Sequence, residues 1–116
     1  METEEKQLEL YNSVIRYREK RSQVLPEVAA AADAVRTVVY KDGALSRKVK
    51  RLIAMAVALG IGCMPCIIAQ TKQAVEAGAT KEEVLEAASV LLAIQGTSGY
   101  SESWRVVKIL EELGMM

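Results

Sequence analysis

Residues 60–70 read Gly60-Ile-Gly-Cys63-Met-Pro-Cys66-Ile-Ile-Ala-Gln70, and they hold both cysteines of the 116-residue chain. Apolar, alanine-rich segments with helical periodicity lie on either side of the two cysteines. The two glycines are expected to end the first helix. Pro65 suits the first turn of the next helix, where its missing N–H does no harm. The stretch therefore predicts a C-x-x-C pair at a helix N-terminus.

The same periodicity extends in both directions, and no strand-like alternation persists for more than a few residues. Ser46 is expected to cap one helix, and Thr80-Lys-Glu-Glu83 forms a capping box for another. The fold class predicted is all-α, a single domain over residues 1–116 built as a bundle of about six helices. The helices are expected at 3–21, 26–40, 46–59, 63–77, 80–94 and 101–113, with residues 95–99 as a loop.

Apolar spacing also predicts which helix faces are buried. The alanine run 29–32 predicts that the second helix packs tightly against a neighbour. The expected buried residues are Leu8, Tyr11, Val14 and Ile15 in the first helix, Val49, Leu52, Ile53, Ala56 and Val57 in the third, and Val84, Leu85, Ala88, Leu91 and Leu92 in the fifth.

Composition excludes several classes of protein. The chain has no histidine, which removes a histidine triad, an imidazole base and an imidazole metal ligand. Its 15 basic and 15 acidic residues balance, so it shows no charge footprint for nucleic acid. Two cysteines are too few for the disulfide framework of a small secreted domain, and the N-terminus Met1-Glu-Thr-Glu-Glu5 is not a signal peptide. A cytoplasmic protein is expected.

Residues 52–71 carry no charge, a length that approaches the ~20 residues of a membrane span. However, Gly60, Gly62 and Pro65 interrupt this run, and much of it is alanine rather than leucine or isoleucine. We therefore interpret it as two buried helices joined by a tight turn, and expect no membrane partner.

A C-x-x-C pair at a helix start has a clear chemical use. Unpaired N–H groups and the positive end of the dipole favour a thiolate there. Positions i and i+3 share a helix face, so one cysteine can attack a substrate and the other can resolve the intermediate. The open alternatives are two buried cysteines that fill space, or a zinc site of four cysteines shared across a dimer. A thioredoxin fold is excluded because the pair follows a helix and not a strand.

The stretch from about Asp42 to Ala88 resembles the carboxymuconolactone decarboxylase/alkylhydroperoxidase D superfamily. The matching motifs are Asp42-Gly-Ala-Leu-Ser46, Lys50-Arg-Leu-Ile-Ala-Met-Ala-Val-Ala-Leu59, Gly62-Cys63-Met-Pro-Cys66, Ala74-x-x-Ala-Gly-Ala-Thr80 and Glu82-Glu-Val84. The resemblance implies an all-α fold that assembles as trimers or larger rings. It also implies a peroxide-attacking thiolate at Cys66, with Cys63 as its resolving partner.

Two positions depart from that family pattern. The alkylhydroperoxidase D branch has a histidine where this chain has Gln70, and a glutamate where it has Arg51. Those two family residues relay protons to the thiol, whereas glutamine cannot act as a general base. Glu102 is a candidate replacement acid, although an acidic residue at a helix start also simply complements the dipole. Trp104 is expected to anchor a core or an interface.

The leading hypothesis is a thiol–disulfide oxidoreductase or hydroperoxide-reducing enzyme, with Cys63, Cys66 and Gln70 as its catalytic residues and with no metal or cofactor. Its expected partners are a second copy of the chain, in a trimer or hexamer, a hydroperoxide or disulfide substrate, and a thiol reductant. Two alternatives remain open: a non-catalytic oligomeric binding module with a degenerate site, and a decarboxylase-like enzyme on the same fold.

Overall fold

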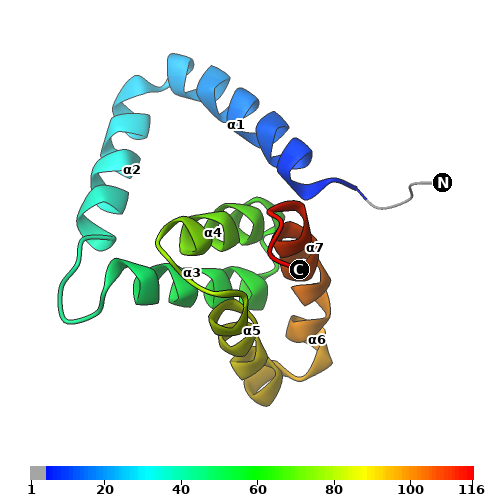
Figure 1. The fold of residues 1–116 in the computed structure, drawn as a ribbon. Coiled ribbons are helices and arrows are strands. Elements are labelled where there is room, and N and C mark those ends of the chain that lie inside the picture. Colours follow the sequence, from blue (N-terminus) through cyan, green and yellow to red (C-terminus); the bar gives the residue numbers. More distant parts are fainter. Residues whose placement is uncertain (1–4) are drawn as a thin grey trace.

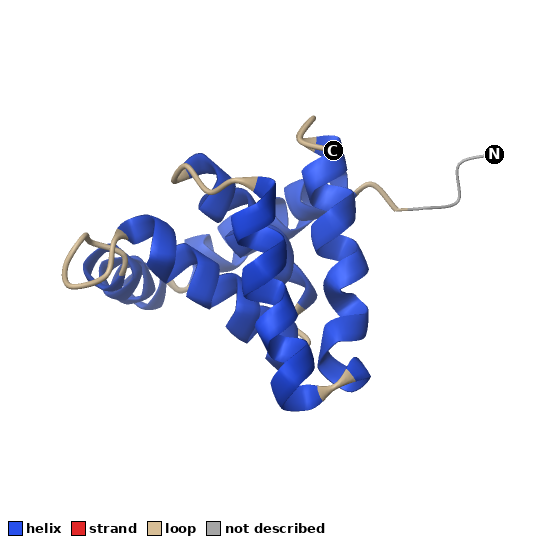
Figure 2. Ribbon diagram, turned by 60° about the horizontal axis from the view of Figure 1, so that its bottom comes forward, coloured by secondary structure: helices blue, strands red, loops and turns tan. Residues whose placement is uncertain are grey.

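The computed structural model describes residues 5–116, and no β-strand occurs within them (Figures 1 and 2). Six longer helices are joined by short connections, as the sequence predicts, and a four-residue helix and a 3-10 turn precede the last one. The elements are α1 (Gln7–Val24), α2 (Pro26–Val39), α3 (Arg47–Ile61), α4 (Met64–Glu76), α5 (Lys81–Gln95), α6 (Thr97–Tyr100), η1 (Ser101–Ser103) and α7 (Trp104–Glu112).

The capping signals in the sequence are confirmed. Ser46 Oγ accepts a hydrogen bond from the Val49 N–H at 3.2 Å, and the Thr80–Glu83 capping box is complete. The expected first-helix residue Thr3 lies outside the described residues, and α1 begins at Gln7. The loop predicted at 95–99 is wrong, because Gln95 ends α5 and residues 97–99 lie in α6.

The main core lies where α3, α4, α5 and α7 meet. Its fully buried side chains include Met55, Leu59, Ile67, Val84 and Leu110. A second, smaller cluster joins α1 to α4 and α7 through Tyr11, Ile68 and Ile109. The first-helix stripe predicted from the sequence packs into this cluster, so α1 is attached to the bundle at its N-terminal half.

Polar contacts hold the start of α1 against α7. The carboxylate of Glu112 accepts hydrogen bonds from the backbone N–H groups of Gln7 and Leu8, at 2.7 and 3.0 Å. The buried Gln7 side chain accepts a hydrogen bond from Arg105 Nη1 at 2.9 Å. These contacts satisfy N–H groups at a helix start, which have no partner within the helix.

From that attachment α1 and α2 form an arch that surrounds one end of the α3–α4 pair (Figure 1). The tight packing predicted for the alanine run of α2 is wrong, because α2 has no buried residue. Two expected core residues of α3 are also exposed, Ile53 at 48% and Val57 at 55%. Leu92 of α5 is likewise exposed rather than buried. Ile53 and Val57 face a hollow beneath the end of α2, so the apolar stripe of α3 is wider than the core it contacts.

No helix in the described residues is long and apolar enough to cross a membrane. The uncharged run 52–71 is divided between α3 and α4, as expected from its glycines and proline.

Candidate functional site

The two cysteines lie at the junction of α3 and α4. Gly62 ends α3 in the left-handed region, at φ 71°, which glycine adopts without a steric penalty. The chain then reverses, and the Cys63 N–H donates to the Ala58 carbonyl at 3.1 Å. Cys63 is the N-cap of α4, and Pro65 lies in its first turn, as the sequence predicts.

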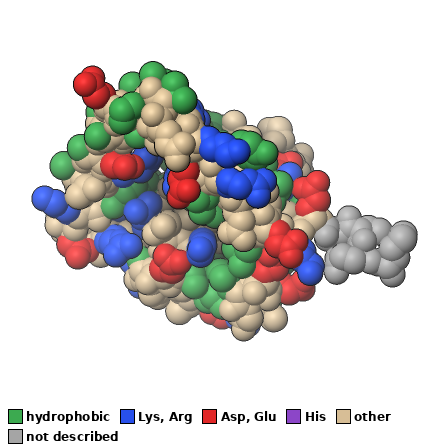
Figure 3. All heavy atoms as spheres, turned by 90° about the horizontal axis from the view of Figure 1, so that it is seen from above, with side chains coloured by type: hydrophobic (Ala, Val, Ile, Leu, Met, Phe, Trp, Pro, Cys, Tyr) green, Lys and Arg blue, Asp and Glu red, His purple; other side chains and the backbone are tan. Residues whose placement is uncertain are grey.

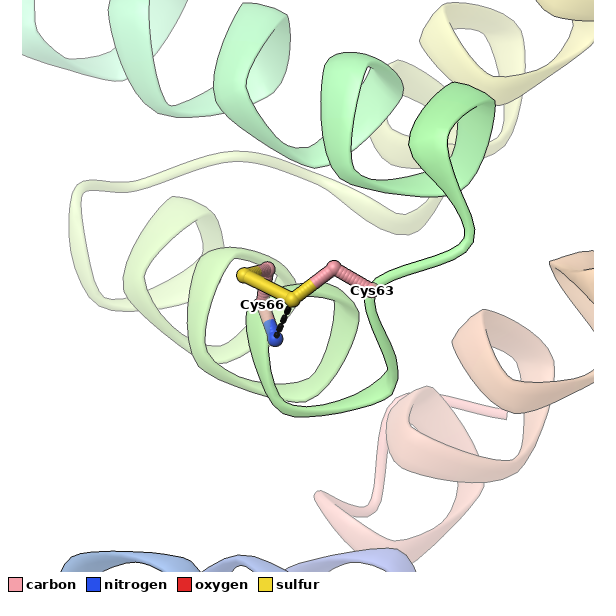
Figure 4. Close-up of a disulfide and its surroundings, with 2 residues drawn as sticks. All are labelled: Cys63 and Cys66. Carbon is pink, nitrogen blue, oxygen red and sulfur yellow. Dashed lines mark hydrogen bonds between the residues drawn. A yellow bond between two sulfur atoms is a disulfide. The ribbon is translucent and has the colours of Figure 1, made fainter. Parts of the chain in front are cut away.

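Cys63 and Cys66 form a disulfide, with their Cα atoms 5.2 Å apart (Figure 4). The Cys63 Sγ also accepts a hydrogen bond from the Cys66 N–H at 3.3 Å, drawn as a dashed line in Figure 4. Sulfur thus occupies the position that a serine or aspartate oxygen takes at an ordinary N-cap. When the disulfide opens, a thiolate on Cys63 lies where the helix N-terminus stabilises negative charge.

Two hollows meet at Cys66. The first, here called the α1–α4 hollow, has a volume of about 580 Å³ and lies between α1, α2 and the start of α4. The second, the α2–α3 hollow, has a volume of about 590 Å³ and lies between the end of α2, α3 and α4. Cys66 and Gln70 line both hollows. Cys66 is thus a lining residue shared by the two hollows.

The structure brings Arg51 and Gln70 into direct contact. Arg51 Nη1 donates a hydrogen bond to Gln70 Oε1 at 2.9 Å, linking α3 to α4. Because a guanidinium has only donors, this contact fixes the glutamine oxygen toward Arg51. The Gln70 amide NH₂ remains as the other half of the side chain, one helical turn after Cys66. The pair supplies hydrogen-bond donors and no general base.

Tyr40 completes this group from the C-terminal end of α2. The Arg51 guanidinium carbon lies 3.5 Å from the centroid of the Tyr40 ring, a close cation–π contact. Partial burial lowers the pKa of the Arg51 guanidinium from its usual range, and Tyr40 partly offsets this effect. Arg51 Nε is buried and has no hydrogen-bond partner among the described residues. Arg51 is therefore a constrained residue of the site and not an ordinary solvated one.

The structure does not bring Glu102 to the cysteines. Glu102 lies in η1, where its Oε2 accepts a hydrogen bond from Arg105 Nε at 3.0 Å, and it lines neither hollow. Trp104 begins α7 and is 43% exposed, so it is not a core residue. Among residues 5–116 no group of three or more cysteine, aspartate or glutamate side chains is placed to hold a metal ion.

Sequence reasoning missed the contribution of α1 and α2 to the site. Arg18, Arg21 and Arg36 line the α1–α4 hollow, and Tyr40 lines the α2–α3 hollow. Arg18 and Arg21 are one turn apart on α1, which indicates a shared helix face. Nothing local shows that this face looks toward a cysteine more than 40 residues away in the chain.

The fold and the cysteines together define a class of all-α protein with a disulfide-forming cysteine pair at a helix start. A family model, that of the carboxymuconolactone decarboxylase family, matches residues 26–108. The chain belongs to this family, as the resemblance in the sequence indicates.

The chain is also similar to two curated proteins and to one solved structure. The chain is 36% identical over 80 residues to an uncharacterized protein in the cox locus of Paracoccus denitrificans, covering 69% of this chain and 72% of that one. It is 34% identical over 77 residues to an uncharacterized protein of Cupriavidus necator, covering 66% and 68%. It also matches the crystal structure of a carboxymuconolactone decarboxylase family protein from Legionella pneumophila in its apo form. That match has 28% identity and a TM-score of 0.88 and covers 94% of this chain and 97% of the other.

Proposed function

We propose that this protein is a thiol–disulfide oxidoreductase whose Cys63–Cys66 pair cycles between dithiol and disulfide. The observation that carries the proposal is the position of the pair. Cys63 caps α4 and receives a hydrogen bond from the Cys66 N–H, while Cys66 lines two hollows. A disulfide that serves only stability needs neither a helix N-terminus nor an open approach to one of its sulfurs.

The two sulfurs have different roles in this proposal. A substrate thiolate attacks Cys66 Sγ, the S–S bond breaks, and Cys63 leaves as a thiolate held at the start of α4. A second substrate thiolate then attacks the substrate sulfur of the mixed disulfide and releases the Cys66 thiolate. Two substrate thiols become one disulfide, and the two electrons and two protons reside on Cys63 and Cys66. In the reverse direction Cys66 attacks a substrate disulfide and Cys63 resolves the intermediate.

Hydroperoxide reduction is the second candidate reaction at the same site. The Cys66 thiolate would attack a peroxide oxygen, the O–O bond would break to leave a sulfenic acid on Cys66, and the alkoxide would take up a proton. Cys63 would then form the disulfide and release water. The departing alkoxide is strongly basic and needs a proton donor, whereas a departing thiolate is stable at neutral pH. Gln70 and Arg51 supply no such acid, which favours disulfide exchange over peroxide reduction.

The test of this proposal compares both substrates on one protein. Reduced wild type is mixed with 2-hydroxyethyl disulfide or with cumene hydroperoxide, and the loss of protein thiols is followed by intact mass. We expect disulfide exchange faster than that of a free cysteine derivative, with peroxide consumed more slowly. The Cys63→Ser variant should stop at a mixed disulfide on Cys66, because the resolving thiol is absent. Wild-type thiols no more reactive than free cysteine would contradict the proposal and favour a non-catalytic binding module.

We also propose that the protein acts in the cytoplasm with a cellular thiol as its reductant, and that it works as a homo-oligomer, a trimer or hexamer. The support for an oligomer is helix α2, which has no buried residue and on which Val28, Val35 and Val38 are each more than 60% exposed. On the face seen in Figure 3, green hydrophobic side chains reach the surface between charged ones. A helix with no fully buried residue in its own chain is stabilised when a partner covers it.

Sedimentation equilibrium at micromolar concentration tests the assembly. We expect a mass that is three or six times 12.7 kDa. We also expect the Val28→Asp/Val35→Asp variant to dissociate. A matched control, Ala30→Asp/Ala34→Asp, adds the same charge at exposed alanines of α2 and tests whether charge alone has this effect. A wild-type monomer would rule out the oligomer.

A further inference from the structure

The α1–α4 hollow has a basic lining contributed by α1 and α2. Besides Cys66 and Gln70, the hollow is lined by Arg18, Arg21 and Arg36, and no carboxylate side chain lines it. The chain as a whole has equal numbers of basic and acidic residues. The lining of the α1–α4 hollow, with three arginines and no carboxylate, is therefore more positive than the chain average. Apolar and aromatic side chains, including Leu10, Tyr11 and Val14, complete the wall.

The arginines form few ion pairs, and the two carboxylates nearest to them, Glu19 and Asp33, line an adjoining hollow between α1 and α2 together with the same three arginines. Within residues 5–116 neither Arg18 nor Arg21 forms an ion pair. Arg36 Nη1 lies 3.2 Å from Asp33 Oδ1, a pair that is largely exposed and therefore weak. Gln70 adds an amide donor, because its oxygen is occupied by Arg51. The polar groups lining this hollow beside Cys66 are thus mainly cations and hydrogen-bond donors.

The volume of about 580 Å³ lies within the range of small-molecule sites. Arginine is the side chain best suited to bind carboxylates, through paired N–H groups. We propose that the α1–α4 hollow binds the carboxylate groups of a small anionic thiol or disulfide and so selects the substrate that reaches Cys66. This inference deepens the proposed function and rests on it.

The arginines act by binding and not by chemistry. The reduced Cys66 thiolate attacks one sulfur of the carboxylate-bearing disulfide, whose S–S bond breaks and releases one substrate thiolate. Cys63 then attacks Cys66, releasing the second substrate thiolate and restoring the protein disulfide. Two electrons pass from the protein dithiol to the substrate, and the protons lost from the protein thiols leave with the products. Arg18, Arg21 and Arg36 hold the substrate carboxylates during both steps.

Three disulfides of similar size and different charge test the inference. They are 3,3′-dithiodipropionate, a dianion, 2-hydroxyethyl disulfide, which is neutral, and cystamine, a dication. Second-order rate constants for the oxidation of the reduced full-length protein are measured at low ionic strength. The wild type is compared with an Arg18→Gln/Arg21→Gln/Arg36→Gln variant. Lys81→Gln, on α5 and lining neither hollow, controls for loss of a remote positive charge.

For each protein, the rate constant with the dianion is divided by the rate constant with the dication. The ratio for each variant is then compared with the wild-type ratio, so that the intrinsic reactivities of the probes cancel. In water, the interaction between two unit charges at contact distance changes a rate about fivefold. The triple variant removes three positive charges, so we expect it to lower the ratio at least ~10-fold. Circular dichroism of each variant checks that it is folded, and the neutral probe measures any change in thiol reactivity that is common to all three probes. High salt should reduce the wild-type preference.

Two failures remain distinguishable. If all three probes react, but the ratio is unchanged in the triple variant or falls equally in Lys81→Gln, the anion site is refuted and the oxidoreductase remains. If no probe reacts faster than with free cysteine, the proposed function fails and the anion site fails with it.

Discussion

The Cys63–Cys66 disulfide should stabilise the fold only modestly, and that magnitude follows from its short loop. The bond joins residues three apart in sequence, so it restricts little of the unfolded chain. The chain-entropy relation gives about 2 kcal/mol for a four-residue loop, against about 4.7 kcal/mol for a loop of 100 residues. Reduction should therefore leave the protein folded, as a dithiol that cycles requires.

The prediction translates into a melting temperature. At the average unfolding entropy per residue of globular proteins, 2 kcal/mol corresponds to a fall in Tm of about 8 °C for a chain of this length. Thermal unfolding followed by circular dichroism, with and without a phosphine reductant and at one protein concentration, measures the difference. Unfolding at room temperature on reduction, or no change in Tm, would refute the reasoning.

Two substitutions separate the disulfide from the helix cap. Cys63→Ser and Cys63→Ala both remove the disulfide, but serine retains an N-cap acceptor for the Cys66 N–H. We expect Cys63→Ser to melt close to reduced wild type and Cys63→Ala to be less stable by about 1 kcal/mol. Equal stability of the two variants would show that a side-chain acceptor at position 63 contributes nothing.

Three further predictions concern the core, pH and the relay position. Ile67→Ala should lower the free energy of unfolding by ~2–5 kcal/mol because the side chain is fully buried, whereas Ile61→Ala, at an exposed position, should change it little by the same urea titration. Hydrogen bonds from the Lys48 side chain and, second, from the Thr80 N–H lower the pKa of the Glu83 carboxyl in the folded protein. The ionised carboxylate therefore stabilises the fold at pH values above the unfolded-state pKa, and this stabilisation is lost as pH falls through the folded-state pKa. Glu83→Gln should thus be less stable than wild type at pH 7 and match it near pH 2, and an equal deficit at both pH values would contradict this assignment. A double-mutant cycle of Arg51→Met and Gln70→Ala should give a favourable coupling of about 1–3 kcal/mol in thermal unfolding, and additive effects would show that the contact is not formed in solution.

Local signals in the sequence were sufficient for the helices and the dithiol. Ser46, Thr80 and Gly62 act through contacts within a few residues, so each boundary can be predicted without knowledge of the tertiary fold. The positions of Pro65 and the two cysteines at the start of α4 could also be predicted, because proline is favoured in the first turn of a helix whatever the tertiary fold. The missed helix α6 is four residues long and follows Gly96, a composition that also suits a loop.

Burial was harder to predict, because it depends on which elements meet. The alanines and valines of α2 form an apolar pattern that indicates packing, yet no residue of α2 is fully buried within this chain. The same argument applies to Ile53 and Val57, whose apolar side chains line a hollow rather than a core. An apolar stripe shows that a face avoids water, but not whether its own chain covers it.

The site itself was only half predictable. Cys63, Cys66 and Gln70 follow from one motif, but the contact of Gln70 with Arg51 joins two helices. The basic wall of the α1–α4 hollow joins three elements, and no spacing rule along the sequence connects its arginines to Cys66.

The redox potential of the Cys63–Cys66 pair tests the central claim most directly. The protein is equilibrated in glutathione buffers of graded ratio, and the dithiol and disulfide forms are separated by intact mass after acid quenching. Catalytic dithiols have potentials between about −270 and −120 mV, whereas structural disulfides lie below about −300 mV. We predict a reversible two-electron transition within the catalytic range. A potential below −300 mV, or a pair that glutathione does not reduce, would contradict the account.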